Sequence, residues 1–394
     1  DDGTEGIGFT SRRYELRSCQ RSEGLLFYEM SIHKNFYAVI MAGGGGTRLW
    51  PLSRRSCPKQ MLQLFKGKSL FEIALERLRG IYDPSHIFVV TVAEQVEVLS
   101  GLAPELPKEN FLIEPMPRGT AAVVAMAAAC LKQIDPKAVI AILTADHFIE
   151  NVADFTETLE AAYQMAETDV LVTLGIQPTF PSTGYGYIES GEQVNSFEHV
   201  KAYKVNAFIE KPSEARAIEF IRNGRFSWNS GMFIWKVDVI LSEIKRYMPA
   251  LYETIKKLNP LLLTDHSQDE FSELWSAIKP QTIDYGIMEK SDRVIVLPAS
   301  TLGWNDVGSW DSLFEVLTPD LDGNIVINAK HVGMETDDSL IFSTSKDRMV
   351  VTIGLQNMII VDTPDAVLLC PRGESQRIKE LVNYLKENNY TQYL

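Results

Sequence analysis

The 394-residue sequence has few cysteines and no long uninterrupted apolar run. Because no stretch of about 18 apolar residues occurs, we expect no membrane-spanning helix. The cysteines lie far apart along the chain and form no C-x-x-C pair; they are Cys19, Cys57, Cys130 and Cys370. This scatter predicts free thiols in a reducing, cytoplasmic setting rather than a disulfide framework or a thiolate metal site.

The sequence also lacks an excess of basic residues and any spacing typical of zinc sites or nucleophile triads. Its formal net charge of −14 argues against a nucleic-acid binder, which would present a basic face. His147 has no second histidine or cysteine at a zinc-ligand spacing, so we predict a structural role for it. An acidic chain that binds phosphates must therefore gather cations locally or use a metal ion.

Strand and helix patterns alternate over the first half of the chain. We predict strands at 36–41, 87–91, 111–113, 138–143 and 170–174, and helices at 69–80, 94–99, 120–134 and 153–167. Ser69 and Glu72 predict a capping box at the start of the first helix. This alternation predicts an α/β fold with a doubly wound, mixed, mostly parallel sheet, whose ligands bind beyond the carboxyl ends of the strands.

The pattern changes after residue 185. We expect strands near residues 187, 208 and 233, helices near 215 and 239, and a helical region over 237–278. Short strands then follow at 324–328, 339–343, 349–353, 358–362 and 367–369, before a helix at 374–389. Three parts are predicted: a poorly ordered extension over 1–35, a main domain over 36–318 and a small β-rich domain over 319–394. Met30 stands where a start codon would be expected.

A glycine-rich segment follows the first predicted strand, in the sequence FYAVIMAGGGGTRLWPLSRRSCPKQ. Four consecutive glycines allow backbone N–H groups to approach an anion, and Arg48 and Lys59 supply positive charge. The segment is not a Walker A loop, because no Gly-Lys-Ser/Thr follows. It does not fit G-x-G-x-x-G either, since Leu49 occupies the last glycine position. We interpret it as a phosphate-binding loop.

Polar residues elsewhere at strand ends allow two interpretations each. Asp146 follows the strand at 138–143 and fits either a Mg²⁺ ligand or a turn cap. Asp306 precedes a short helix, and its sequence alone favours a helix N-cap. Glu210 and Lys211 fit either a solvated ion pair or a carboxylate for hydroxyl groups beside a cation for an anion, and Asn229 fits either a turn or a contact to a pair of hydroxyl groups.

The segment AGGGGTRLWPLSRRSCPKQ resembles the signature of sugar-1-phosphate nucleotidyltransferases, and its Leu-Trp-Pro-Leu-Ser form is most similar to mannose-1-phosphate guanylyltransferases. The resemblance is close over residues 36–317 and looser beyond. It implies a Rossmann-like catalytic domain followed by a short β-helix. Some longer relatives carry an additional isomerase domain, so for this chain we expect a single activity.

The resemblance also implies roles for particular residues. Asp146 and Asp306 would bind Mg²⁺, the latter through Trp-x-Asp-x-Gly, and Lys211 would bind the sugar phosphate. The sugar would contact Gly184, Glu210 and Asn229. The nucleotide would contact Ala42, Gly43, Gly44, Gly46, Thr47, Arg48, Lys59, Glu114, Arg118, Gly119 and Thr120, of which the last four belong to the base-reading segment.

Two positions depart from the family pattern. Thr144 replaces a proline before Asp146, and Ala122 replaces a proline in many relatives, which leaves base selectivity less secure than catalysis. The role of Asp284, in the family block TIDYGIMEK, stays open.

The implied reaction joins GTP and mannose 1-phosphate into GDP-mannose and diphosphate, with Mg²⁺ and catalytic contacts from Arg48, Lys59, Asp146, Lys211 and Asp306. A homodimer is expected. The alternatives are another sugar 1-phosphate or nucleotide, and a catalytically silent nucleotide-sugar sensor.

Overall fold

The computed structural model describes residues 33–43, 46–54, 56–65, 67–197, 200–263, 268–345 and 347–394. Most of the predicted N-terminal extension, together with Gly44 and Cys19, lies outside these residues. Within them, the helices are all too short or too polar to span a bilayer. Cys57, Cys130 and Cys370 are free thiols, as predicted.

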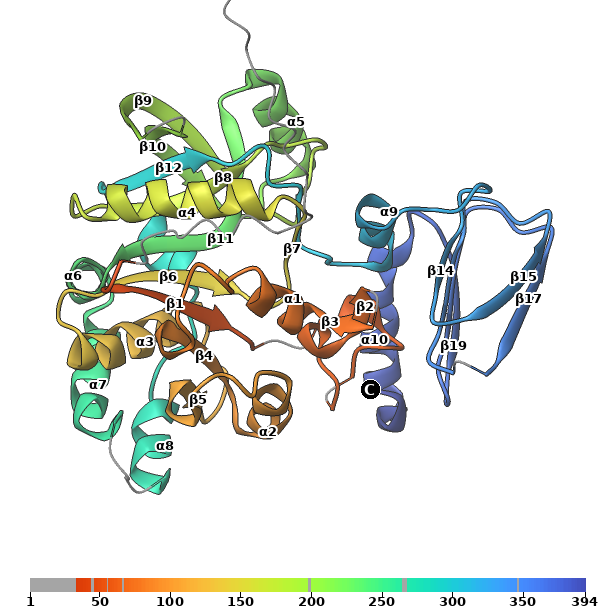
Figure 1. The fold of residues 1–394 in the computed structure, drawn as a ribbon, viewed down its shortest axis with the longest axis horizontal. Helices are drawn as coiled ribbons and strands as arrows, with labels where there is room; N and C mark the ends of the chain where they lie inside the picture. Colours follow the sequence, from red (N-terminus) through yellow and green to blue (C-terminus); the bar gives the residue numbers. More distant parts are fainter. Residues whose placement is uncertain are drawn as a thin grey trace, which may run out of the picture. The chain divides into compact units, whose positions relative to one another are not determined.

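A nine-stranded sheet forms the centre of the described main domain (Figure 1). Its order is β5 (Phe111–Glu114), β4 (Ile87–Val92), β1 (Phe36–Met41), β6 (Val139–Thr144), β11 (Phe226–Lys236), β8 (Leu171–Ile176), β12 (Val294–Pro298), β10 (Val200–Ile209) and β9 (Tyr187–Phe197). Only β10 and β11 run against the other strands, as their antiparallel pairings show. The sheet is therefore mixed and mostly parallel in strand direction, as predicted.

Helices cover both faces of this sheet (Figure 1). On one face, α4 (Val152–Ala166) packs its Phe155 and Leu159 into a cluster with alternate residues of β1 and β6. On the other, α3 (Thr120–Ile134) packs with α6 (Val237–Tyr247) and α7 (Pro249–Leu258). The alanines of α3 are buried throughout, and their small side chains allow close approach to the sheet.

Local sequence signals located several elements accurately. β1 and α3 have the predicted bounds. Ser69 caps α1 (Leu70–Glu76), and its side chain and that of Glu72 form the predicted capping box. The remaining helices of the main domain are α2 (Ala93–Leu102), α5 (Glu214–Asn223), α8 (Gln268–Ser276) and α9 (Leu313–Val316). Strand β12 was missing from the prediction, as were the short pairs β2 (Gln63–Phe65) with β3 (Lys68–Ser69) and β7 (Phe148–Ile149) with β13 (Trp304–Asn305).

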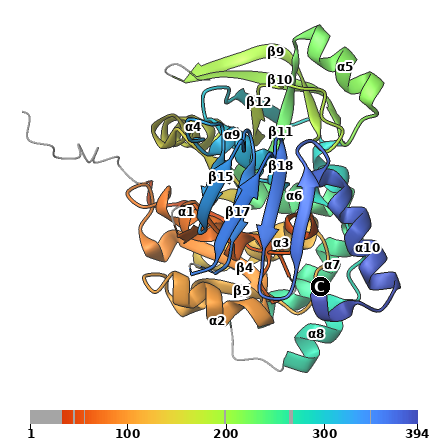
Figure 2. The same cartoon turned by 90° about the vertical axis from the view of Figure 1, so that its right-hand side faces the viewer.

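The C-terminal part consists of short parallel coils. Strands β14 (Ile325–Ile327), β16 (Leu340–Ser343) and β18 (Met358–Asp362) form one parallel ladder, closed by antiparallel β19 (Val367–Pro371). Strands β15 (Lys330–Met334) and β17 (Met349–Ile353) form the other, and Figure 2 shows them side by side. This arrangement is a short β-helix, as the resemblance implied. The prediction omitted β15, which is mostly exposed and polar at its start.

The β-helix and the final helix, α10 (Ile378–Glu387), share an apolar cluster with the segment after the glycine loop. Leu49 and Leu62 pack in the same cluster as Phe342 and Ile378. Trp310, from the loop after Asp306, is fully buried there and donates through Nε1 to the Trp50 carbonyl at 3.0 Å. The C-terminal part is thereby anchored to the two loops that carry predicted site residues.

Candidate active site

The glycine loop begins at the carboxyl end of β1, in the parallel half of the sheet. The Ala42 carbonyl accepts hydrogen bonds from Gln60 Nε2 at 3.1 Å and from Thr91 Oγ1 at 3.0 Å. These bonds fix the start of the loop. Gly44 lies outside the described residues, whereas Gly43 follows Ala42 directly.

Gly46 closes the loop in a left-handed conformation, with φ of 48°. A Cβ atom at this position would overlap the Cβ of Lys59. Ser53 Oγ donates to the Gly46 carbonyl at 2.7 Å. Glycine is therefore required here both for backbone conformation and for close packing against Lys59.

Lys59 links the two predicted metal ligands. Its side chain is largely buried, and Nζ donates to Asp146 Oδ2 at 2.8 Å and to the backbone carbonyl of Asp306. Asp146 follows β6 by two residues, and Asp306 follows β13 directly. Asp146 and Asp306 lie 87 and 247 positions from Lys59 in the sequence, yet both contact its ammonium group.

The Asp306 carboxylate has its own partners. Tyr185 donates through its hydroxyl to Oδ1 at 2.8 Å, and the Gly308 amide donates to the same oxygen at 3.1 Å. The bond to a residue two positions on is typical of an Asx turn. The nearby 3-10 helix is capped by Ser309 instead, so the N-cap interpretation of Asp306 is wrong.

A buried arginine supports the turn that carries Asp146. Arg77, only 4% exposed, donates to the carbonyl of Thr144 at 3.1 Å and to that of His147 at 2.7 Å. These two carbonyls flank Asp146 in the sequence. Burial lowers the pKa of Arg77 to about 10, which leaves it charged at neutral pH.

The charges around Asp146 favour its ionised form. Burial acts to raise the pKa of Asp146, but the charge and hydrogen bond of Lys59 oppose it, and the net pKa is lowered. Burial lowers the pKa of His147 to about 4, so this imidazole is neutral at neutral pH. Its Nδ1 accepts from Trp304 Nε1 at 3.1 Å, which agrees with the predicted structural role.

The predicted sugar residues line a cavity of about 210 Å³ beside this centre. Gly184, Glu210 and Asn229 all contribute to it, and so do Asp284 and Asp306. Asn229 Nδ2 donates to Asp284 Oδ1 at 2.9 Å. Burial, reinforced by Glu210, raises the pKa of Asp284 to about 6. The residue whose role stayed open thus holds the side chain of Asn229 within the cavity.

Lys211 and Glu210 pair with each other through Nζ and Oε1. The Lys211 side chain is more exposed than that of Glu210. The backbone of Lys211 adopts a left-handed conformation, with φ of 50°. The contact between the two side chains matches the interpretation of these residues as an ion pair. Its position at the cavity also agrees with the sugar-phosphate interpretation, since Glu210 lines the cavity.

The predicted base-reading segment includes a buried carboxyl group. Glu114 is 5% exposed, and its Oε2 has no hydrogen-bond partner among the described residues. Burial raises its pKa to about 7. Its Oε1 lies 3.4 Å from the position that a Cβ of Gly43 would take, so Glu114 faces the glycine loop.

The rest of the base-reading segment packs against residues 281–283, just before Asp284. Gly119 has a φ of 81°, and a Cβ there would overlap the Gln281 carbonyl. Thr120 Oγ1 accepts from the Ile283 amide at 2.9 Å. Arg118 donates to the Ser276 carbonyl at 2.7 Å.

Two of the predicted catalytic cations point in different directions. Lys59 contacts the aspartates, whereas Arg48 donates through Nη1 to Gln376 Oε1 at 3.0 Å. Gln376 belongs to the segment that leads into α10. The C-terminal domain therefore contacts a residue of the signature motif.

The donor set fits Mg²⁺. The described residues contain no group of three His, Cys, Asp or Glu side chains able to hold a metal by themselves. Asp146 nevertheless meets Lys59 through its carboxylate and Asp306 through its backbone carbonyl, so both residues lie beside one ammonium group. Mg²⁺ is commonly held by one or two carboxylates together with substrate phosphates. Two carboxylates beside a phosphate-binding loop match that pattern.

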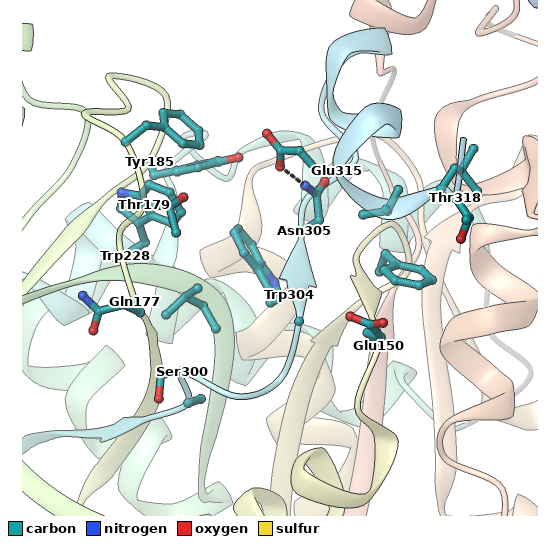
Figure 3. A pocket seen from close by; sticks show the side chains of 17 residues that line it. Glu150, Gln177, Thr179, Tyr185, Trp228, Ser300, Trp304, Asn305, Glu315 and Thr318 are labelled. Atoms are coloured by element: carbon teal, nitrogen blue, oxygen red, sulfur yellow. Dashed lines mark hydrogen bonds between the residues drawn. The ribbon is translucent and has the colours of Figure 1, made fainter. Parts of the chain in front are cut away.

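A larger cavity of about 440 Å³ lies next to the smaller one (Figure 3). Tyr185 and Trp304 line both cavities. The lining includes Glu150 and Glu315 but no lysine, arginine or histidine among the described residues. The lining of the smaller cavity likewise contains no lysine or arginine among the described residues, but it includes Gly184, Glu210 and Asn229. Because these are the predicted sugar contacts, the smaller cavity is the better candidate for the sugar.

Sequence reasoning missed Tyr185 and Arg77 as parts of the site and left the role of Asp284 open. Tyr185 lies between two glycines of STGYGYIE, which is the one local signal that it follows an unusual turn. Arg77 occupies the end of an ordinary amphipathic helix and carries no such signal. Their roles depend on contacts over 70 and 121 positions, which no local pattern contains.

Comparison with known proteins matches both parts of the chain. Residues 37–323 match the family described as "Nucleotidyl transferase", and residues 329–385 match "MannoseP isomerase/GMP-like beta-helix domain". An Escherichia coli protein named mannose-1-phosphate guanylyltransferase is 36% identical over 366 residues, which cover 90% of this chain and 75% of that protein. A Salmonella typhimurium protein of the same activity is 36% identical over 373 residues, covering 91% and 74%.

A solved structure agrees with the fold. The crystal structure of a Thermus thermophilus protein described as "mannose-1-phosphate geranyltransferase" is similar, with a TM-score of 0.79 and 32% identity. The match covers 89% of this chain and 99% of that one. The similarity therefore extends over the central sheet and the short β-helix together.

Proposed function

The chain belongs to the mannose-1-phosphate guanylyltransferase family of nucleotidyltransferases, and we propose that it transfers GMP from GTP to α-D-mannose 1-phosphate. The products are GDP-mannose and diphosphate. The observation that carries this proposal is the position of Lys59, which joins Asp146 and Asp306 beside the glycine loop.

The reaction is an in-line displacement at phosphorus. A phosphate oxygen of mannose 1-phosphate forms a new bond to the α-phosphorus of GTP. The bond from that phosphorus to the oxygen bridging the β-phosphorus breaks, and its electron pair leaves with diphosphate. Because the attacking oxygen is already anionic at neutral pH, no strong general base is needed. The enzyme must instead bring two anions together and offset their charge.

Several cations would offset the negative charge of the two substrates. Lys59 and Arg48 would hold the triphosphate from the glycine loop, and Lys211 would leave its pair with Glu210 to bind the sugar phosphate. Asp146 and Asp306 would hold Mg²⁺, which when bound supplies positive charge to the phosphate oxygens. The low pKa of Asp146 keeps it ionised for that role.

The sugar would occupy the 210 Å³ cavity. Glu210 accepts hydrogen bonds only, while Asn229 both donates and accepts, and this combination suits neighbouring hydroxyl groups. Asp284 keeps the Asn229 amide in place through the 2.9 Å bond. The backbone of Gly184 would approach the sugar without a side chain in between.

Glu114 supports guanine as the base. An ionised carboxylate can accept from the N1–H and N2–H donors of guanine at the same time, whereas adenine and cytosine present an acceptor at the matching position. The Oε2 atom of Glu114 lacks a partner among the described residues, and its Oε1 atom faces Gly43 of the glycine loop, where a nucleotide would bind.

The test is a substrate panel. Purified protein would be incubated with Mg²⁺ and either mannose 1-phosphate or glucose 1-phosphate, each with GTP, ATP, UTP and CTP. We expect GDP-mannose, identified by mass spectrometry, as the main product. A different product would replace the substrate assignment and keep the mechanism. Binding of GDP-mannose without turnover of any pair would favour the sensor. The homodimer and the cytoplasmic location stay predictions; light scattering of the purified chain measures the first.

A further inference from the structure

We propose that Arg372, in the C-terminal domain, joins Arg48 in binding the diphosphate part of GTP and of the leaving group. This inference rests on the proposed function. The two arginines line one cavity of about 660 Å³, which also reaches Asp306 and Tyr185. The cavity therefore continues from the catalytic aspartate to a segment more than 60 residues further along the chain.

Arg372 is held in a way that leaves its hydrogen-bond donors available. Its guanidinium carbon lies 4.0 Å from the ring centre of Phe314, in α9. Stacking on an aromatic ring fixes the plane of a guanidinium without using its N–H groups. Among the described residues, neither Arg372 nor Arg48 forms an ion pair with a carboxylate. The Arg372 guanidinium and the N–H groups of Arg48 that do not bind Gln376 therefore remain available for an anion, in a chain whose net charge is −14.

The backbone that carries Arg372 is tied to the catalytic loop. Asp311, five residues after Asp306, accepts from the Gly373 amide at 2.7 Å and from the Ser375 amide at 3.2 Å. Gln376 then accepts the 3.0 Å bond from Arg48. Arg372, the Asp306 loop and the signature motif are thus joined by short contacts.

The cavity also contains carboxylates, and each is already engaged. Asp311 accepts from the two amides and from the Ser375 hydroxyl, and Asp306 from Tyr185 and Gly308. Glu315 accepts from Asn305 Nδ2 at 2.6 Å. The Arg372 guanidinium makes no side-chain hydrogen bond among the described residues, and Arg48 donates through Nη1 to Gln376. Both groups therefore keep N–H donors whose planar arrangement matches phosphate oxygens.

The leaving group is the part of the substrate that fits this position. The diphosphate would extend from the α-phosphorus, next to Asp306, past Arg48 and towards Arg372. On this assignment, mannose 1-phosphate and GDP-mannose, which lack the leaving diphosphate, would not contact Arg372. Arg372 should therefore affect GTP and diphosphate and leave the other two reactants unaffected.

The experiment compares Arg372→Gln with wild type and with Arg377→Gln, using the full-length chain. Arg377 belongs to the same domain and pairs with Glu374 at 3.2 Å, outside the cavity, so it is a matched charge-loss control. Initial rates would be measured in both directions with Mg²⁺ at saturation. We expect Arg372→Gln to raise KM for GTP and for diphosphate by about 10- to 100-fold, as for loss of a charge-assisted hydrogen bond. KM for mannose 1-phosphate and for GDP-mannose should stay within about twofold.

Arg372→Lys should be intermediate, because it keeps the charge and loses the fork. Equal KM values for Arg372→Gln and Arg377→Gln would overturn the inference, and so would an equal rise for all four reactants, since that indicates a structural defect. If wild type turns over no pair, the proposed function fails instead. If it uses another pair, the same comparison is made with that pair, because diphosphate is still released.

Discussion

Lys59 Nζ lies 2.8 Å from Asp146 Oδ2, so the cation of the glycine loop and a carboxylate predicted to bind metal are already paired in the folded chain. The same ammonium binds the Asp306 carbonyl. A single side chain therefore sets the distance between the phosphate loop and both carboxylate-bearing turns.

Lys59→Gln should lower kcat by about 10²- to 10³-fold, because it removes one preorganised charge from the transition state. The measurement is steady-state diphosphate release from GTP and mannose 1-phosphate. Lys68→Gln is the control, since Lys68 is exposed and pairs with Glu76. A kcat loss in Lys59→Gln no larger than in the control would contradict the role of Lys59.

Tyr185→Phe should increase the Mg²⁺ concentration needed for half-maximal rate by about 3- to 10-fold, the size of one lost hydrogen bond to a charged group. The hydroxyl of Tyr185 orients the Asp306 carboxylate through the 2.8 Å bond. Mn²⁺ binding, followed by electron paramagnetic resonance, gives a readout independent of turnover. Tyr384→Phe, at an exposed position of α10, should change neither value. An unchanged metal affinity in Tyr185→Phe would show that this bond does not orient Asp306.

Arg77→Met should destabilise the fold by about 3 kcal/mol, because it removes a buried guanidinium and leaves two partly buried carbonyl groups without their donor. Those carbonyls belong to Thr144 and His147, on either side of Asp146. Urea denaturation measures the free energy of unfolding. Arg79→Met, which removes an exposed pair with Glu105, should cost less than about 1 kcal/mol. Equal losses in the two variants would contradict the account of Arg77.

Glu114 should make the fold less stable as the pH rises. Burial raises its pKa from 4.5 to about 7, so the folded chain holds a proton that the unfolded chain has already released. The folded state therefore binds more protons between pH 4.5 and 7, and this part of the stability is lost as pH rises through that window. The total is on the order of 3 kcal/mol.

Glu114→Gln should remove this pH-dependent part. The measurement is urea unfolding at pH 5, 6, 7 and 8, with Glu109→Gln as an exposed control. The difference in stability between Glu114→Gln and wild type should grow with pH in favour of the variant. A difference that is constant across the series would mean that Glu114 titrates normally. The variant should also discriminate less between GTP and other nucleotides.

Local sequence signals predicted the parts of the fold that depend on local interactions. The apolar run of β1 and the alanine-rich run of α3 gave their bounds, and Ser69 with Glu72 gave a helix start. Strand β15 was missed because it is exposed and begins with Lys330 and His331, so burial does not shape its sequence. Strand β12 was missed although it is apolar, since only its position between β8 and β10 distinguishes it from a buried loop.

The site was predicted as a set of residues and not as a set of contacts. The signature motif and its resemblance located Lys59, Asp146 and Asp306. The partners of these residues depend on tertiary structure, as for Tyr185 with Asp306 and for Arg48 with Gln376, which are 328 positions apart. Side chains that act over such separations leave no periodic or spacing signal in a single sequence.

The most direct test of the account compares Asp146→Asn with wild type in diphosphate release from GTP and mannose 1-phosphate across a Mg²⁺ titration. Asn keeps the size of the side chain and removes the charge that holds the metal. We predict a loss of at least about 10²-fold in kcat. In the same variant, thermal stability should stay within a few degrees of wild type. Wild-type rates and wild-type Mg²⁺ dependence in Asp146→Asn would contradict the central claim that this carboxylate, beside Lys59, organises the reaction.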